Sequence, residues 1–211
     1  KLMENKTKEF VLDQTTIKKL LTAYKLTIPD FQRSFVWKKN KKYQLISSLS
    51  KGFPIGAITL YEDKGQYYII DGLQRINTLQ QYLSSPSEIV GFKEYYSKIS
   101  DDIKNFLAKN DLKIRENQLK TCIKKLYEGL KGLYEYEKMT VLYNTIKSKQ
   151  DIFKFLNDLD LVAELFDILQ LNIRIVHDDI VLIIYKGDKE DLPELFKNIN
   201  TGSVALSQYE I

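Results

Sequence analysis

The feature that most constrains the fold is the stretch of residues 69–79, where an apolar run ends in Asp71-Gly72 and helical spacing begins at once. The β-branched residues before Asp71 predict the end of a buried strand. Apolar residues then recur at helical intervals, at Leu73, Ile76, Leu79 and Leu83. A strand that passes into a helix through one glycine leaves the first helical N–H groups unpaired at the strand end, where an anion can bind.

Two interpretations of residues 71–78 stay open at the level of sequence. In the first, a phosphate binds at the junction: Gly72 lets the backbone approach the anion, and Arg75 supplies a planar fork of donors. Asp71 would hold Mg²⁺ or orient a water molecule, and Gln74 would position that water. In the second, Asp71 and Gln74 form a capping box. The cap leaves Arg75 unexplained, because a cation in the first helical turn opposes the helix dipole.

Two further polar clusters lie upstream and downstream of this one. Residues 28–33 follow a short predicted strand, and residues 198–202 follow a predicted helix. Their ordinary interpretations are a strand end with a surface arginine, and a helix C-terminus with a left-handed residue. In the functional interpretation, Arg33 is a second phosphate donor, and residues 200–202 form a polar loop that closes over a nucleotide.

The rare residues narrow the chemistry. One cysteine, Cys122, and one histidine, His177, exclude an intramolecular disulfide, a cysteine-rich zinc site and a two-histidine metal site. We expect Cys122 to be a small buried hydrophobe and His177 to be structural or solvent-exposed. The lysines of residues 38–42 predict a solvated helix start, with contact to a nucleic-acid backbone as the alternative.

Composition sets the class of protein. A hydrophobic content of 44% supports a buried core, and a net charge of +4 permits nucleic-acid contact without requiring it. No apolar run reaches the roughly 18 residues of a membrane span, and no signal peptide is apparent. We therefore expect a soluble, cytoplasmic protein with no membrane partner. The chain also reads as a piece of a longer protein.

Local patterns predict most of the secondary structure. Helices are expected over residues 15–24, over residues 41–50 with Asn40 as the cap, and after Gly72, with Thr78 and Tyr82 away from the apolar side. A hairpin is expected over residues 57–61 and 66–70, and a loop over residues 84–87. Three to five helices are expected between residues 100 and 170. Strands follow over residues 26–28, 171–176 and 180–185, and a last helix runs from Asp191 to about residue 199.

Together and in this order, the three clusters resemble the DGQQR-motif domain, the N-terminal part of GmrSD-type, modification-dependent restriction endonucleases. The matching stretches are residues 28–37, 70–79 and 196–207, and the resemblance covers about residues 10–211. One departure is Leu73, which stands where the family has its first glutamine. That change bears on whether the domain hydrolyses its nucleotide or only binds it.

The resemblance implies an α/β (α+β) fold of the ParB/sulfiredoxin-like kind, with a small mixed sheet and a large helical insertion. Residues 10–87 and 171–211 would form a nucleotide-binding core, and residues 88–170 a helical segment. The implied activity is binding and hydrolysis of a nucleoside triphosphate, which licenses DNA cleavage by a separate HNH-type nuclease domain in bacterial defence against phage. With one histidine and one cysteine, this chain cannot hold that nuclease site, so it is expected beyond residue 211 or on another chain.

The resemblance also implies the site residues. The implied catalytic residues are Asp71, which also binds Mg²⁺, Gln74 and Arg75. The implied nucleotide-binding residues are Gln32, Arg33, Gly72, Arg75, Asn77, Thr78, Asn200, Thr201 and Gly202. DNA contact and oligomer formation are compatible with this assignment. Two alternatives remain at this stage: a non-enzymatic ParB-like DNA-binding module, and a structural partner domain.

Overall fold

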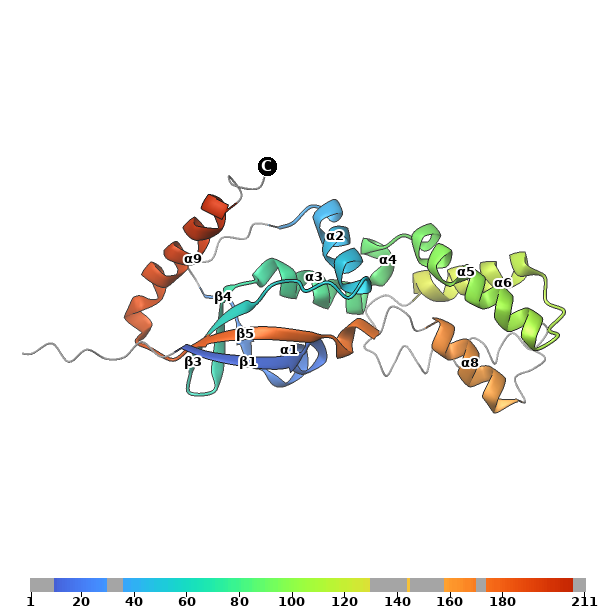
Figure 1. Cartoon of the computed structure of the whole chain (residues 1–211), viewed down its shortest axis with the longest axis horizontal. Coiled ribbons are helices and arrows are strands. Elements are labelled where there is room, and N and C mark those ends of the chain that lie inside the picture. The colour runs from blue at the N-terminus through green and yellow to red at the C-terminus, as the bar shows by residue number, and fades with distance from the viewer. Residues whose placement is uncertain (1–9, 30–35, 130–143, 145–157, 170–173, 207–211) are drawn as a thin grey trace, which may run out of the picture. The chain divides into compact units, whose positions relative to one another are not determined.

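The computed structural model describes residues 10–29, 36–129, 144, 158–169 and 174–206 (Figure 1). The strands are β1 (Phe10–Thr16), β2 (Leu26–Thr27), β3 (Ile58–Asp63), β4 (Gln66–Asp71) and β5 (Asp179–Tyr185). The α-helices include α1 (Ile17–Ala23), α2 (Lys39–Ser50), α3 (Leu73–Ser84), α4 (Pro86–Ile89), α5 (Phe92–Lys109), α6 (Glu116–Gly129), α8 (Leu159–Leu169) and α9 (Leu192–Leu206). Short 3₁₀ turns, η3 (Arg174–His177) and η4 (Lys189–Asp191), flank β5. The predicted α+β class is confirmed.

The five strands form one mixed sheet in the order β1-β5-β3-β4-β2. β3 and β4 make the predicted hairpin, in which Asp63 pairs with Gln66. The two turn residues, Lys64 and Gly65, have φ angles of 49° and 80°. Positive φ at both positions matches the backbone twist of the flanking strands. β5 runs parallel to β3 and antiparallel to β1, so strands that are far apart in the sequence are neighbours in the sheet.

The chain divides into two compact units, which we call the sheet unit and the helical unit. The sheet unit comprises residues 1–38, 51–77 and 176–211, and the helical unit comprises residues 39–50 and 78–175. Helix α3 begins in the sheet unit and continues in the helical unit from Thr78. Compactness does not show which part folds independently, so the domain bounds expected from the sequence stay a prediction.

A row of aromatic side chains crosses one face of the sheet. Phe10, Tyr185, Tyr61 and Tyr68 are register partners on adjacent strands. Their ring centroids are separated by 5.0, 6.1 and 5.8 Å in that order. Helix α9 packs on this row and on β4 through four apolar residues. These are Leu192, Leu195, Phe196 and Ile199.

The helical unit has a core rich in tyrosine. The rings of Tyr95 and Tyr127 stack at 4.0 Å with an interplanar angle of 3°. Both hydroxyls donate to backbone carbonyls: Tyr95 to Leu169 at 3.0 Å, and Tyr127 to Val90 at 2.9 Å. Buried hydroxyls need such acceptors. The two bonds therefore connect the ring stack to the C-terminal ends of α8 and α4. Cys122 is buried in α6, as predicted.

Several local predictions were wrong. The expected strand at 171–176 is contradicted over its described part, since Arg174–His177 is a 3₁₀ turn. A short apolar run does not by itself distinguish a strand from a helical turn. Helix α2 begins at Lys39, so Asn40 is not its cap, and α4 begins within the expected loop at 84–87. Thr78 and Tyr82 are buried, because packing covers α3 on more than its aliphatic side.

Helix α9 corrects the prediction for the third cluster. It does not stop near residue 199 but runs to Leu206, so residues 200–202 are helical rather than a loop. Asparagine and glycine often end a helix, yet a mid-helix glycine costs only about 1 kcal/mol relative to alanine. Helix formers after Gly202, among them Ala205 and Leu206, offset that cost.

Candidate functional site

The site is built on the junction between β4 and α3. β4 ends at Asp71, α3 begins at Leu73, and Gly72 between them has a φ of 97°. The N–H of Ile76 donates to the Gly72 carbonyl at 2.9 Å and closes the first helical turn. A Cβ atom at Gly72 would lie 2.2 Å from Ile58 Cδ1. Both the dihedral angle and the lack of space therefore require glycine here.

Arg75 occupies the centre of this junction and is held by two acceptors. Its Nη2 atom lies 2.6 Å from Asp71 Oδ2, and its Nη1 donates to the Ile55 carbonyl at 2.9 Å. The Arg75 side chain is 15% exposed and that of Asp71 is 39% exposed. Two glycines give the guanidinium room, since a Cβ at Gly56 or Gly72 would lie 2.9 or 3.3 Å from its nitrogens. Asp71 supplies the negative charge that a cation in the first helical turn needs.

The positions and hydrogen bonds of Asp71 and Gln74 argue against the capping-box interpretation. Gly72, rather than Asp71, occupies the position before the helix. Gln74 Oε1 accepts from the backbone N–H of Trp37 at 3.1 Å, and Asp71 Oδ2 accepts from Arg75. The Gln74 bond also ties Trp37, which follows the upstream cluster in the sequence, to the β4–α3 junction.

The remaining predicted residues lie in different environments. Asn77 is exposed on α3, and Thr78 is fully buried. Asn200, Thr201 and Gly202 lie in the second half of α9. Gln32 and Arg33 lie outside the described residues. Leu73, at the position of the family's first glutamine, is half-buried.

Sequence reasoning missed the contacts that residues 55 and 56 make with Arg75. Ile55 contributes a backbone carbonyl, and Gly56 contributes an open space at a φ of 79°. The sequence signal was Gly56 itself, two residues before a strand, where a glycine often marks a close approach of another group. The Ile55 contact could not be predicted from residue type, because every residue has a backbone carbonyl.

Among the described residues, no three His, Cys, Asp or Glu side chains gather closely enough to hold a metal ion. Within the described ranges, no helix is both long enough and apolar enough to cross a membrane.

The fold and the junction define an α+β domain with a mixed sheet and a strand–glycine–helix unit that encloses an arginine–aspartate pair. The chain belongs to the family of GmrSD restriction endonuclease N-terminal domains, whose model matches residues 17–211. This confirms the resemblance drawn from the three sequence clusters, and the protein is part of a restriction endonuclease system. No curated protein matches the sequence.

Proposed function

We propose that the β4–α3 junction binds a nucleoside triphosphate and hydrolyses it with Mg²⁺, and that this reaction licenses DNA cleavage by a separate HNH-type nuclease domain. The observation that carries the proposal is the position of Arg75. A guanidinium has five N–H donors, and the bonds to Asp71 and Ile55 use two of them. A cation held in place before the reaction stabilises charge that develops on a phosphoryl group.

Asp71 fits the role of a magnesium ligand. Its Oδ2 is engaged by Arg75, and its side chain is 39% exposed, so its second oxygen can reach a cation. Mg²⁺ in nucleotide sites is usually held by one or two carboxylates together with phosphate oxygens and water, so a single aspartate suffices. The ion would neutralise phosphate charge during transfer. Asp71 would orient it relative to Arg75.

The other predicted residues fall into three supporting roles. Gln74 would donate through its amide nitrogen to a phosphate or water, because its oxygen accepts from Trp37. Gly72 would let the phosphate approach the first N–H groups of α3, and Asn77 would contact the nucleotide from the exposed side of α3. Gln32, Arg33 and residues 200–202 complete the proposed nucleotide contacts, and the fully buried Thr78 would act only by packing α3 beneath them.

The binding test is the shift in melting temperature with ATP, GTP, CTP or UTP plus Mg²⁺. A ligand at about 100 times its dissociation constant stabilises the folded state by about 2.7 kcal/mol. Arg75→Ala should abolish the shift, and Asp71→Asn should remove its dependence on Mg²⁺. The matched control is Arg115→Ala, which removes an exposed arginine of the helical unit and should keep the full shift.

Each variant is compared with and without nucleotide, so a lower melting temperature of the free variant does not affect the result. If none of the four triphosphates shifts the wild type, or if Arg75→Ala shifts as much as Arg115→Ala, the Asp71–Arg75 pair is structural only.

Hydrolysis is tested separately, by phosphate release from the bound nucleotide. Leu73→Gln restores the residue expected from the family and should raise the rate if that glutamine assists the attacking water. If neither the wild type nor Leu73→Gln releases phosphate while both still bind the nucleotide, only the nucleotide-binding part of the proposal remains. The proposal that hydrolysis licenses the nuclease is tested by measuring DNA cleavage with the nuclease domain present. Cleavage with the hydrolysable nucleotide is compared with cleavage in the presence of a non-hydrolysable analogue.

A further inference from the structure

The positive charge of this protein is concentrated in the helical unit. The sheet unit contains equal numbers of basic and acidic residues, so the net charge of +4 lies entirely in the helical unit. Within that unit α8 and α6 differ in charge, whereas α5 carries both signs and α2 carries three lysines. Helix α8 carries Asp160, Glu164 and Asp167 and no basic residue. Helix α6 carries three lysines and has acidic residues only near its two ends, at Glu116 and Glu128.

The lysines of α6 share one exposed surface. Lys120, Lys124 and Lys125 are exposed, whereas the opposite side of the helix is buried. Residues four apart lie next to each other on a helix, so Lys120 neighbours Lys124, and Thr121 neighbours Lys125. Neutral donors and two further cations extend the same segment: Asn117, Gln118, Thr121, Lys113 and Arg115. We call residues 113–125 the basic segment.

Two contacts bear on how available these lysines are. Lys120 Nζ lies 4.7 Å from the centroid of the Tyr96 ring, which holds its side chain against α5. Lys124 lies 3.9 Å from Glu128 with its side chain 54% exposed, a long and solvated ion pair that costs little to replace. The lysines are thus partly ordered and not neutralised.

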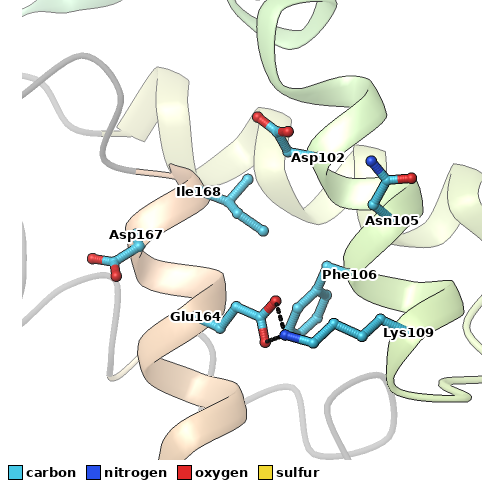
Figure 2. Close-up of a pocket in the computed structure, with 7 residues that line it drawn as sticks. All are labelled: Asp102, Asn105, Phe106, Lys109, Glu164, Asp167 and Ile168. Carbon is cyan, nitrogen blue, oxygen red and sulfur yellow. Dashed lines mark hydrogen bonds and ion pairs between the residues drawn. The ribbon is translucent and has the colours of Figure 1, made fainter.

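The acidic residues that line a pocket of the unit lie on α5 and α8, outside the basic segment. A pocket of about 340 Å³ between α5 and α8 is lined by Asp102, Glu164 and Asp167, with Lys109 bonded to Glu164 (Figure 2). In Figure 2 the lysine reaches across the pocket to that carboxylate. This side repels an anionic partner, so the unit presents opposite charge on two of the helices that pack against α5. Such an asymmetry orients a charged partner as it approaches.

From this charge distribution we propose that the basic segment binds the phosphate backbone of duplex DNA without sequence selectivity. Lysine, arginine and neutral donors of the Thr, Asn and Gln type are the side chains that make phosphate contacts. The partner is DNA because the chain is part of a restriction endonuclease system. The proposal does not depend on the nucleotide site, and it is tested without nucleotide.

The experiment measures the affinity of the whole chain for a short labelled duplex of mixed sequence at several salt concentrations. The test variant combines Lys120→Gln, Lys124→Gln and Lys125→Gln. Loss of three phosphate contacts should make the negative slope of log K against log salt less steep by about 2.7. It should also weaken binding about tenfold at low salt. The control variant combines Lys18→Gln, Lys19→Gln and Lys189→Gln, which removes the same charge from exposed positions of the sheet unit.

Unchanged affinity and slope in the test variant would overturn the proposal, as would an equal loss in the control variant or no duplex binding by the wild type. Melting curves of both variants, taken first, ensure that loss of the Lys120 contact with Tyr96 is not read as loss of DNA contact. A third variant, Asp160→Asn with Glu164→Gln and Asp167→Asn, should leave the salt slope unchanged. A slope altered as much by this variant would also contradict the assignment to α6.

Discussion

The sheet unit and the helical unit bury polar groups in different ways. In the sheet unit, the partly buried Arg75 pairs with the more exposed Asp71 at a junction whose backbone adopts positive φ at Gly56 and Gly72. In the helical unit, the hydroxyls of the buried Tyr95 and Tyr127 donate to backbone carbonyls in a regular helical core. Unusual backbone conformations are concentrated where functional side chains are held. The sheet unit is therefore where we propose the nucleotide site.

The largest effect that distinguishes the units should appear at alkaline pH. Burial raises the pKa of Tyr24 and Tyr185 in the sheet unit to about 12, and a nearby aspartate adds to each shift. Burial raises the pKa of Tyr82, Tyr95 and Tyr127 in the helical unit further. A raised folded-state pKa contributes stability that is complete below the unfolded-state pKa of about 10 and is lost as pH rises through the folded-state pKa.

We therefore expect both units to lose stability above pH 10, and the helical unit to lose more. Trp37, the only tryptophan in the sequence, reports the sheet unit by fluorescence, and helical circular dichroism reports mainly the helical unit, which contains α2, α4, α5, α6 and α8. Loss of the Trp37 signal before the helical signal would contradict the ranking.

The second prediction concerns the junction backbone. Gly72→Ala should destabilise the protein by about 3 kcal/mol, because it adds a left-handed alanine and a clash with the core. The clash is with Ile58, whose Cδ1 would lie 2.2 Å from the new Cβ. Gly91→Ala is the control, since Gly91 has a φ of −66° and nothing within 4 Å of a Cβ. Denaturant unfolding measures both, and equal costs would show that the junction has no special conformational demand.

The third prediction concerns the tyrosine core of the helical unit. Tyr127→Phe keeps the ring stack and removes only the hydroxyl, which leaves the Val90 carbonyl without that donor. We expect a loss of about 1–2 kcal/mol in the free energy of unfolding. The half-buried Tyr67 of the sheet unit supplies the comparison, and Tyr67→Phe should cost much less. A similar cost at both positions would mean that the ring environment, not the hydroxyl bond, dominates.

The smallest expected effect is at Asp178, which precedes β5. Burial and the neighbouring Asp179 raise its pKa, while His177 partly offsets them. Because the folded state favours the protonated form, the ionised carboxylate is mildly destabilising at neutral pH. Asp178→Asn should raise the melting temperature slightly at pH 7 and lose this gain in acid. A gain that does not change with pH would assign the effect to packing rather than charge.

Features decided by short-range pattern were predictable. The turn at Lys64-Gly65, the strand ending at Asp71 and the helix after Gly72 follow from residue type and spacing within a few positions. The amphipathic helices α5 and α6 follow from the same periodicity. Strand β1 escaped prediction because its pairing with β5 joins segments far apart in the sequence.

Taken alone, the amino-acid sequence determined the α+β class, the strand–glycine–helix unit and the membership in the restriction endonuclease family, because each depends on local periodicity or on ordered motifs. Tertiary structure decided what Arg75 contacts. The Ile55 carbonyl, the space at Gly56 and the Trp37 bond to Gln74 come from segments that only the folded chain brings together. The course of α9 through residues 200–202 was likewise decided in the fold, because packing on the aromatic row anchors the helix that carries them.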